Sequence, residues 1–284
     1  MSKFNMNNLA SDIRKQFKDN PRMSKKIGVG SDLPQLTEAD FVTMPSWWKE
    51  CTGVPGLPFG KMVMIAGNSD TGKTSCAIEA MKAAQAQSIG IIYVETEGKC
   101  TEADLKNWGV DPTGILLVQS SIAEEAFELL FMAWDKFKQQ YPSEKLLVIF
   151  DSIGNVVSKR DSEIDLTEQD SKPGGKGKIN RLAISKMIAK RDEDNAAILL
   201  INYTYDQIGG HGKVNAGGTA LNFFSSLTFQ TSRKSWVEKV VKGQKIRIGA
   251  EVIWKLYKNH LNKSADNKKE FTLRITSEGI TRVE

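Results

Sequence analysis

The sequence has few of the residues that build disulfide frameworks or zinc sites. Its only cysteines are Cys51, Cys76 and Cys100, none in a Cys-x-x-Cys pair, and it has two histidines among 284 residues. A disulfide scaffold needs several cysteine pairs, and a structural zinc site needs four closely spaced Cys or His ligands. The composition favours neither class, so we expect all three cysteines to be reduced thiols with a structural role.

Long apolar runs are also missing. No stretch approaches the roughly 20 apolar residues that a membrane-spanning helix needs. The first residues, MSKFNMNNLASDIRKQF, are polar and lack the apolar centre of a secretory signal. Hydrophobic residues make up 40% of the sequence and charged residues 26%, which is typical of globular proteins. We expect a cytoplasmic protein with a sizeable core and no membrane partner.

The net charge of +5 is unevenly distributed. Lysine and arginine strongly outnumber acidic residues in three blocks, residues 1–30, 171–191 and 231–260. Such blocks can form basic patches that face an anionic polymer, or they can be solvated faces with no partner. The sequence leaves both readings open for each block.

The first 41 residues differ in pattern from the rest. Leu9, Ile13 and Phe17 recur every four residues, which predicts a short amphipathic helix over residues 7–17. We expect Pro21 to end this helix and residues 23–36 to form an extended arm. A helix this far from a core needs a partner surface. We therefore treat residues 1–41 as a separate N-terminal helix and arm.

Residues 42–284 are predicted to form an α/β core. Apolar runs at 62–66, 89–94, 115–118, 146–150 and 197–202 alternate with helical patterns at 75–87, 122–140 and 178–190. Continuous apolar strands alternating with helices predict a mainly parallel sheet covered on both faces. Residues 227–283 alternate at period two, which predicts antiparallel strands added to that sheet. We expect residues 159–178 to be a mobile loop, and no separate C-terminal domain.

The segment GNSDTGKT matches the phosphate-loop pattern G-x-x-x-x-G-K-[ST]. A chance match somewhere in such a sequence has a probability on the order of one or two per cent, and the predicted strand before and helix after it lower that further. The alternative is a Gly-rich turn with a surface lysine. The pattern predicts an ATP site in which backbone N–H groups and the helix end hold phosphate oxygens. Its expected residues are Gly67, Asn68, Ser69, Asp70, Thr71, Gly72, Lys73, Thr74 and Ser75.

Three further side chains are candidates for metal binding and hydrolysis. Thr74 is expected to bind Mg²⁺, and Asp151, which ends the apolar strand LLVIFD, has the form of a Walker B aspartate. Glu97 follows the strand IIYVE and is a candidate for polarising the attacking water. Glu95 is a weaker candidate, and both glutamates could instead be solvent-exposed residues at a strand end.

The order of these motifs resembles the RecA-type strand-exchange recombinases, and most closely their phage branch, the UvsX-like proteins. GLPFGKMVMIAGNSDTGKT is similar to the family's entry into the phosphate loop, YVETEG to its glutamate segment and VIFDSIGNV to its Walker B strand. LLINYTYDQIGGHGKVNAGGTALNFFSS and the later YKNHL and FTLRITSEGI follow in the family's order. The resemblance covers nearly the whole chain.

The resemblance implies a DNA-dependent ATPase. It would form a helical filament on single-stranded DNA, pair it with homologous duplex DNA and act in recombination and repair. ATP would lie between protomers, with Glu97 and Lys73 as catalytic residues and Asp151 as the Walker B residue. Lys258 would reach the neighbouring subunit's ATP, and residues 1–41 would be an N-terminal helix and oligomerisation arm that docks on the next protomer. Two loops would face DNA, and their candidate residues are Lys172, Lys176, Lys178, Gly209, Gly210, Lys213, Gly217 and Gly218. Mediator proteins are further candidate partners, and the location would be the host cytoplasm if a phage encodes the protein.

The chain also departs from the bacterial members. Tyr203 stands where they carry a γ-phosphate-sensing glutamine, and His260 stands where they carry a second lysine acting in trans. We expect Lys258 and His260 to lie two apart on one strand and to project from the same face. Thr101 and Asp104 replace the residues that pack on adenine, so base recognition should differ. The first loop is also acidic, with five acidic residues between positions 161 and 170.

Two other functions remain open at this point. The first is a RecA-fold regulatory or structural filament protein that binds nucleotide without strand exchange, which Tyr203 and the absence of a C-terminal domain favour. The second is a hexameric helicase-like motor. Both retain the ATP site and differ in what the assembly does.

Overall fold

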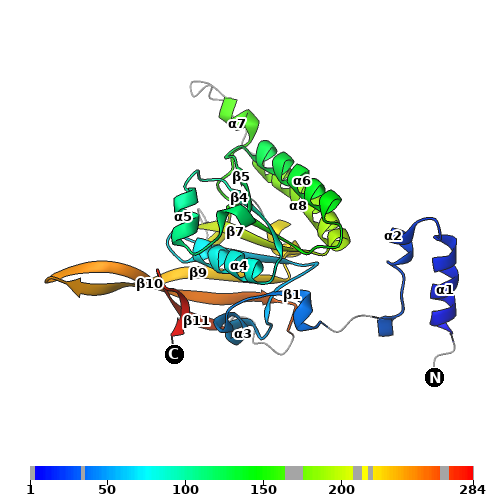
Figure 1. The fold of residues 1–284 in the computed structure, drawn as a ribbon, viewed down its shortest axis with the longest axis horizontal. Helices are drawn as coiled ribbons and strands as arrows, with labels where there is room; N and C mark the ends of the chain where they lie inside the picture. Colours follow the sequence, from blue (N-terminus) through cyan, green and yellow to red (C-terminus); the bar gives the residue numbers. More distant parts are fainter. Residues whose placement is uncertain are drawn as a thin grey trace. The chain divides into compact units, whose positions relative to one another are not determined.

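The structure is a computed structural model that describes residues 4–32, 36–163, 175–206, 213–216, 220–262 and 269–283. The chain divides into two compact units, Met1–Ala39 and Asp40–Glu284. Figure 1 shows the elements of both units along the chain. None of the described helices combines the length and apolarity needed to cross a membrane.

The N-terminal unit contains two capped helices, α1 (Met6–Gln16) and α2 (Pro21–Ser24), and a 3-10 turn at Gly30–Asp32. The helix predicted over residues 7–17 is therefore present as α1. The role expected for Pro21 is wrong: α1 ends before it, and Pro21 begins α2, where its missing N–H costs no hydrogen bond. The arm expected over residues 23–36 is extended only in part, because α2 and the 3-10 turn interrupt it.

The larger unit is built on one sheet of ten strands among the described residues. Its strand order is β12-β11-β10-β9-β3-β7-β6-β4-β5, with β8 paired to β7. Strands β9, β3, β7, β6, β4 and β5 are parallel, and β9 to β12 form antiparallel pairs. The predicted mainly parallel sheet with antiparallel C-terminal strands is thus confirmed. The strand bounds are β3 (Met62–Gly67), β4 (Gly90–Glu95), β5 (Leu116–Gln119), β6 (Leu146–Asp151), β7 (Ala196–Asp206), β8 (Lys213–Asn215), β9 (Leu227–Val241), β10 (Gln244–Asn259), β11 (Glu270–Thr276) and β12 (Gly279–Val283).

Helices cover both faces of the sheet. On one face lie α3 (Ser46–Thr52), α4 (Lys73–Ala86) and α5 (Glu102–Asn107), and on the other lie α6 (Ala123–Gln140), α8 (Gly175–Asp194) and α9 (Ala220–Phe224). Helix α7 (Lys159–Glu163) buries none of its residues. Short 3-10 turns lie at Glu38–Asp40 and Pro112–Gly114. A small two-stranded sheet, β1 (Phe41–Thr43) with β2 (Gly56–Pro58), flanks α3.

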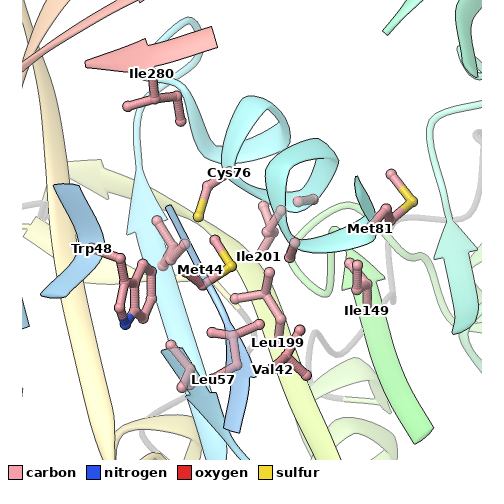
Figure 2. Packing of buried hydrophobic residues seen from close by; sticks show 14 of the residues in the cluster. Val42, Met44, Trp48, Leu57, Cys76, Met81, Ile149, Leu199, Ile201 and Ile280 are labelled. Carbon is pink, nitrogen blue, oxygen red and sulfur yellow. The ribbon is translucent and has the colours of Figure 1, made fainter. Parts of the chain in front are cut away.

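Successive residues of the parallel strands enter two separate cores. Ile65 and Leu199 pack with α4 on one face, whereas Met64 and Leu200 pack with α6 and α8 on the other. Side chains alternate across a strand, so a strand covered on both faces must be apolar throughout. Figure 2 shows part of the first cluster, with Cys76 from α4 and Trp48 from α3 on the same side of the sheet as Leu199.

The antiparallel part extends the sheet into a long hairpin. Strands β9 and β10 pair from Leu227↔Asn259 to Val241↔Gln244 and run outward from the rest of this unit (Figure 1). The two residues between them, Lys242 and Gly243, have φ of 48° and 78°. Such a two-residue turn with positive φ matches the twist of the paired strands.

Two further expectations need correction, one about a loop and one about the end of a strand. The loop expected over residues 159–178 begins with α7 and ends inside α8, and its middle lies outside the described residues. The strand expected to carry both Lys258 and His260 ends at Asn259, so His260 lies just beyond β10. In the inner half of β10, every second residue up to Leu256 is buried. A register shift between Leu256 and Lys258 then makes Asn259, and not Lys258, the next buried residue.

Candidate functional site

The phosphate-loop segment connects β3 to the first residue of α4, as the sequence predicts. Gly72 has a φ of 78° and is the N-cap of α4. A Cβ on Gly72 would lie 1.8 Å from Ile275 Cδ1, and one on Gly67 would lie 1.9 Å from Thr231 Oγ1. The left-handed backbone requires glycine at position 72, and the Thr231 backbone oxygen, 2.5 Å from a Cβ at position 67, requires it there.

Hydrogen bonds from neighbouring strands fix the loop. The Thr71 hydroxyl is 2.8 Å from the Asn68 carbonyl oxygen and 2.6 Å from the Thr231 hydroxyl. Trp254 Nε1 donates to the Thr71 carbonyl at 3.2 Å. At the rim, Arg233 pairs with Asp70 at 3.4 Å. The backbone of the loop is thus held by side chains from β9 and β10, far away in sequence.

Lys73 is buried beneath this loop. Its ammonium donates to the Asn68 carbonyl oxygen at 2.6 Å and lies 4.5 Å from the centre of the Tyr203 ring. Burial lowers the pKa of Lys73 to about 8, although the negative charges of Asp151 and Glu97 act to raise it. A cation is costly to bury without an anion, so this position favours a negatively charged ligand.

Thr74 and Asp151 meet at the carboxyl edge of the sheet. The Thr74 hydroxyl donates to Asp151 Oδ2 at 2.8 Å, and the Tyr93 hydroxyl is 3.5 Å from the same oxygen. Burial raises the pKa of Asp151 to about 6, although the Thr74 hydrogen bond lowers it. A hydroxyl beside a carboxylate fits Mg²⁺, which typically takes one or two protein oxygens together with phosphate oxygens. No group of three or more His, Cys, Asp or Glu side chains that could hold a metal occurs among the described residues.

Glu97 lies next to this pair, and three side chains hydrogen-bond to it. Tyr203 and Asn155 donate to Oε1 at 2.5 Å each, and Lys99 donates to Oε2 at 2.5 Å. Partial burial opposes ionisation, but the bonds from Lys99 and Tyr203 outweigh it and lower the pKa of Glu97. The carboxylate is therefore ionised and oriented at neutral pH.

Glu95 is buried, so its reading as a solvent-exposed strand-end residue is wrong. Its carboxylate accepts the Glu97 backbone N–H at 2.8 Å. Glu95 thereby holds the segment that carries Glu97. Burial follows from the pairing of β4 with β6, in which Glu95 stands opposite Asp151.

Sequence reasoning missed the partners of Glu97. It treated Tyr203 as a nucleotide-binding residue in place of the family glutamine and gave it no protein partner, yet Tyr203 contacts both Glu97 and Lys73. Asn155 and Lys99 were not singled out. No spacing rule links residues 97, 155 and 203, because three different strands bring them together. Ser69, Glu97, Asn155 and Tyr203 line one open cavity of about 660 Å³.

Of the residues expected to contact DNA, only the lysines at positions 176, 178 and 213 are among the described residues. Lys172, Gly209, Gly210, Gly217 and Gly218 lie outside the described residues, and Lys213 begins β8. Lys178 is exposed on α8. Lys176 is partly buried and donates to the Gly154 carbonyl of its own chain, and burial lowers its pKa.

Lys258 and His260 are not part of the cluster around Glu97. The Lys258 ammonium donates to the carbonyl oxygens of Asn222 and Phe223, at 2.9 and 3.1 Å, in the last residues of α9. His260 is exposed, and its backbone N–H donates to the Ser226 carbonyl at 2.9 Å. Within one chain, Lys258 therefore anchors α9 to β10.

Comparison with known proteins agrees with this geometry. The family model for the RecA N-terminal domain matches residues 13–281. A RecA protein of Malacoplasma penetrans is 26% identical over 230 residues, which cover 77% of this chain and 68% of that protein. A RecA protein of Mannheimia haemolytica is 28% identical over 271 residues, covering 92% of this chain and 70% of that protein. A plasmid RecA protein of Lactococcus lactis subsp. lactis is 24% identical over 279 residues, covering 95% and 74%. The chain belongs to the RecA family.

Proposed function

We propose that this chain is a DNA-dependent ATPase that forms helical filaments on single-stranded DNA and promotes homologous pairing and strand exchange. One observation supports it most: Lys73, Thr74, Asp151 and Glu97 converge around the phosphate loop although they come from three elements. This set combines a phosphate cradle, oxygen ligands and a water-orienting carboxylate, the parts that phosphoryl transfer needs. Family membership adds the link to recombination.

The residues have distinct tasks in this proposal. Backbone N–H groups of residues 67–75 and the N-terminus of α4 hold the ATP phosphates, and Lys73 neutralises the transferred group. Thr74 and Asp151 hold Mg²⁺, which supplies positive charge to the phosphate oxygens when bound. Glu97 orients the attacking water and accepts its proton. Tyr203, between Lys73 and Glu97, is the side chain that meets the terminal phosphate.

The assembly is also part of the proposal. Residues 1–41 dock on the next protomer and residues 42–284 form the catalytic core. Lys258 and His260 reach the neighbouring ATP site, and the loops around residues 159–178 and 205–218 face DNA. Lys172, Lys178 and Lys213 supply charge there, while Gly209, Gly210, Gly217 and Gly218 allow close backbone approach. The closest branch is the phage UvsX-like one, on the strength of the motif order.

A RecA-fold filament without strand exchange is the second candidate. The observation that favours it is Tyr203, which stands where bacterial members carry a γ-phosphate-sensing glutamine and which donates its hydroxyl to Glu97 Oε1 at 2.5 Å. A strand-exchange assay between single-stranded circles and homologous duplex separates the two candidates, since only the first yields joint molecules.

Two substitutions test the ATP site. Lys73→Ala should abolish ATP binding, because the buried cation that meets the phosphates is lost. Glu97→Gln should retain ATP binding but slow hydrolysis by at least about a hundredfold, the scale of a positioned base. Fluorescent-nucleotide titration measures binding, and phosphate release with saturating single-stranded DNA measures hydrolysis. Hydrolysis by Glu97→Gln at the parent rate would remove Glu97 from the mechanism.

A further inference from the structure

Asn155 lies in the turn that follows β6, residues 152–155. This turn is fixed on two sides. The Thr96 hydroxyl accepts from the Ser152 backbone N–H at 3.0 Å, and the Ile153 backbone N–H donates to the Ile201 carbonyl at 3.0 Å. The side chain of Asn155 is short, so the backbone of the turn determines where its amide group points. That amide donates to Glu97 Oε1.

Gly154, next to Asn155, packs tightly against the end of β7. A Cβ on Gly154 would lie 2.8 Å from Asn202 Oδ1 and 3.2 Å from the Tyr203 backbone nitrogen. Its carbonyl oxygen accepts the ammonium of Lys176. Lys176 is in the first turn of α8 and is partly buried, with its pKa lowered by burial. It therefore resembles a buried structural donor more than a solvated lysine.

We propose that Asn155 positions the Glu97 carboxylate and that Lys176 holds the turn that carries Asn155. The chain of contacts is Lys176 to Gly154, Gly154 to its neighbour Asn155, and Asn155 to Glu97. Water activation depends on the orientation of the carboxylate, and an amide donor on one oxygen fixes that orientation. Asn155 and Lys176 are thus positioning residues that act through Glu97.

This inference rests on the proposed function. It also changes the part played by Lys176, which the sequence placed among the DNA-contacting lysines. Lys176 lies near the end of the segment 159–178 that would face DNA, and two hydrogen bonds, from Lys176 to Gly154 and from Asn155 to Glu97, connect it to the carboxylate.

Steady-state ATP hydrolysis at saturating single-stranded DNA tests the proposal. Asn155→Ala and Lys176→Met should each lower kcat by about tenfold, the scale of one hydrogen bond to a charged group, with KM for ATP within about twofold of the parent. Lys176→Arg, which keeps a donor near Gly154, should recover part of the loss. Lys178→Met, the exposed neighbour on α8, should instead raise the DNA concentration that gives half-maximal stimulation.

The double variant Asn155→Ala with Lys176→Met carries the decision. If Lys176 acts through Asn155, the double variant loses no more activity than Asn155→Ala alone. Multiplied losses, or a Lys176→Met defect that disappears as DNA is raised, would overturn the proposal. If Asn155→Ala does not fold, Asn155→Asp removes the donor at the same shape and should lose at least as much kcat, and parent-like activity would overturn the proposal.

The parent protein separates this proposal from the one it rests on. If the parent hydrolyses no ATP with single-stranded DNA, the proposed function fails and this inference fails with it. If the parent is active and the Asn155 and Lys176 variants match its kcat, only the positioning roles fail.

Discussion

At the scale of single residues, the site contains two side chains, Asp151 and Lys73, whose charged forms are disfavoured by burial. Asp151 is buried at the end of β6, and burial raises its pKa to about 6. Lys73 is buried nearby, and its pKa is lowered to about 8. Each group would be more stable in water, and each fits a charged ligand that is bound only in the folded protein. Such sites exchange stability for function.

Asp151→Asn should therefore stabilise the ligand-free protein. The folded state holds the Asp151 proton up to about pH 6, whereas an unfolded aspartate loses it near 3.8, so this contribution to stability falls as pH rises through that window. Asparagine stays neutral, so its advantage should reach roughly 1–3 kcal/mol at pH 8 and be smaller at pH 5. Urea unfolding without Mg²⁺ or nucleotide measures it.

Asp192→Asn is the matched control, because that carboxylate is exposed on α8. It should change the free energy of unfolding by less than about 0.5 kcal/mol at either pH. A destabilised Asp151→Asn at pH 8 would mean that the Thr74 and Tyr93 contacts outweigh the burial of the charge.

At the scale of elements, helix α3 packs against the strands β9 and β10, whose side chains hold the phosphate loop. Its Trp47 and Trp48 rings contact Trp254 and Phe229 at centroid distances of 5.7 and 5.5 Å. Trp254 in turn donates to the Thr71 carbonyl of the loop. A short helix with few residues of high helix propensity is thus held by aromatic packing, and through Trp254 this packing reaches the phosphate loop.

Trp48→Ala should destabilise the protein by about 3–5 kcal/mol, because it leaves a large cavity beside β9. Trp236→Ala is the control: Trp236 lies on the β9–β10 hairpin, partly exposed between Arg233 and Arg247. It should cost roughly 1 kcal/mol, from lost cation–π contacts. Thermal and urea unfolding give both values. A similar cost for the two would show that α3 contributes little to the core.

At the scale of the whole molecule, the proposed filament gives each protomer a nucleotide site and the lysine that completes its neighbour's site. Within one chain, Lys258 contacts the end of α9 and not the cluster around Glu97. This separation is what an action in trans requires. The two activities can therefore be removed from different protomers.

Mixing Lys258→Ala protomers with Glu97→Gln protomers should restore part of the ATPase activity. Some interfaces in a mixed filament would combine an intact Glu97 on one side with an intact Lys258 on the other. The measurement is phosphate release at saturating single-stranded DNA, for each variant alone and for the mixture. A mixture as inactive as its components would exclude Lys258 from the neighbouring site.

The sequence alone determined the elements whose pattern is local. The phosphate loop between β3 and α4 follows from glycine spacing. The continuous apolar runs predicted the parallel strands, because a strand whose sheet is covered by helices on both faces is apolar throughout. Period-two alternation likewise predicted β9 to β12. Local pattern was weaker for α3, since Trp47 and Trp48 belong to no helical periodicity, and for Pro21, which can end one helix or begin another.

Only the tertiary structure decided how the site is completed. Glu97 receives hydrogen bonds from Lys99, Asn155 and Tyr203, and two of these come from segments distant in sequence, the turn after β6 and strand β7. Lys176, expected to contact DNA, instead donates to the Gly154 carbonyl of its own chain. Such contacts depend on which strands lie side by side and on where each one ends. Sheet order is set by long-range packing, and residue types and spacings along the chain do not encode it directly.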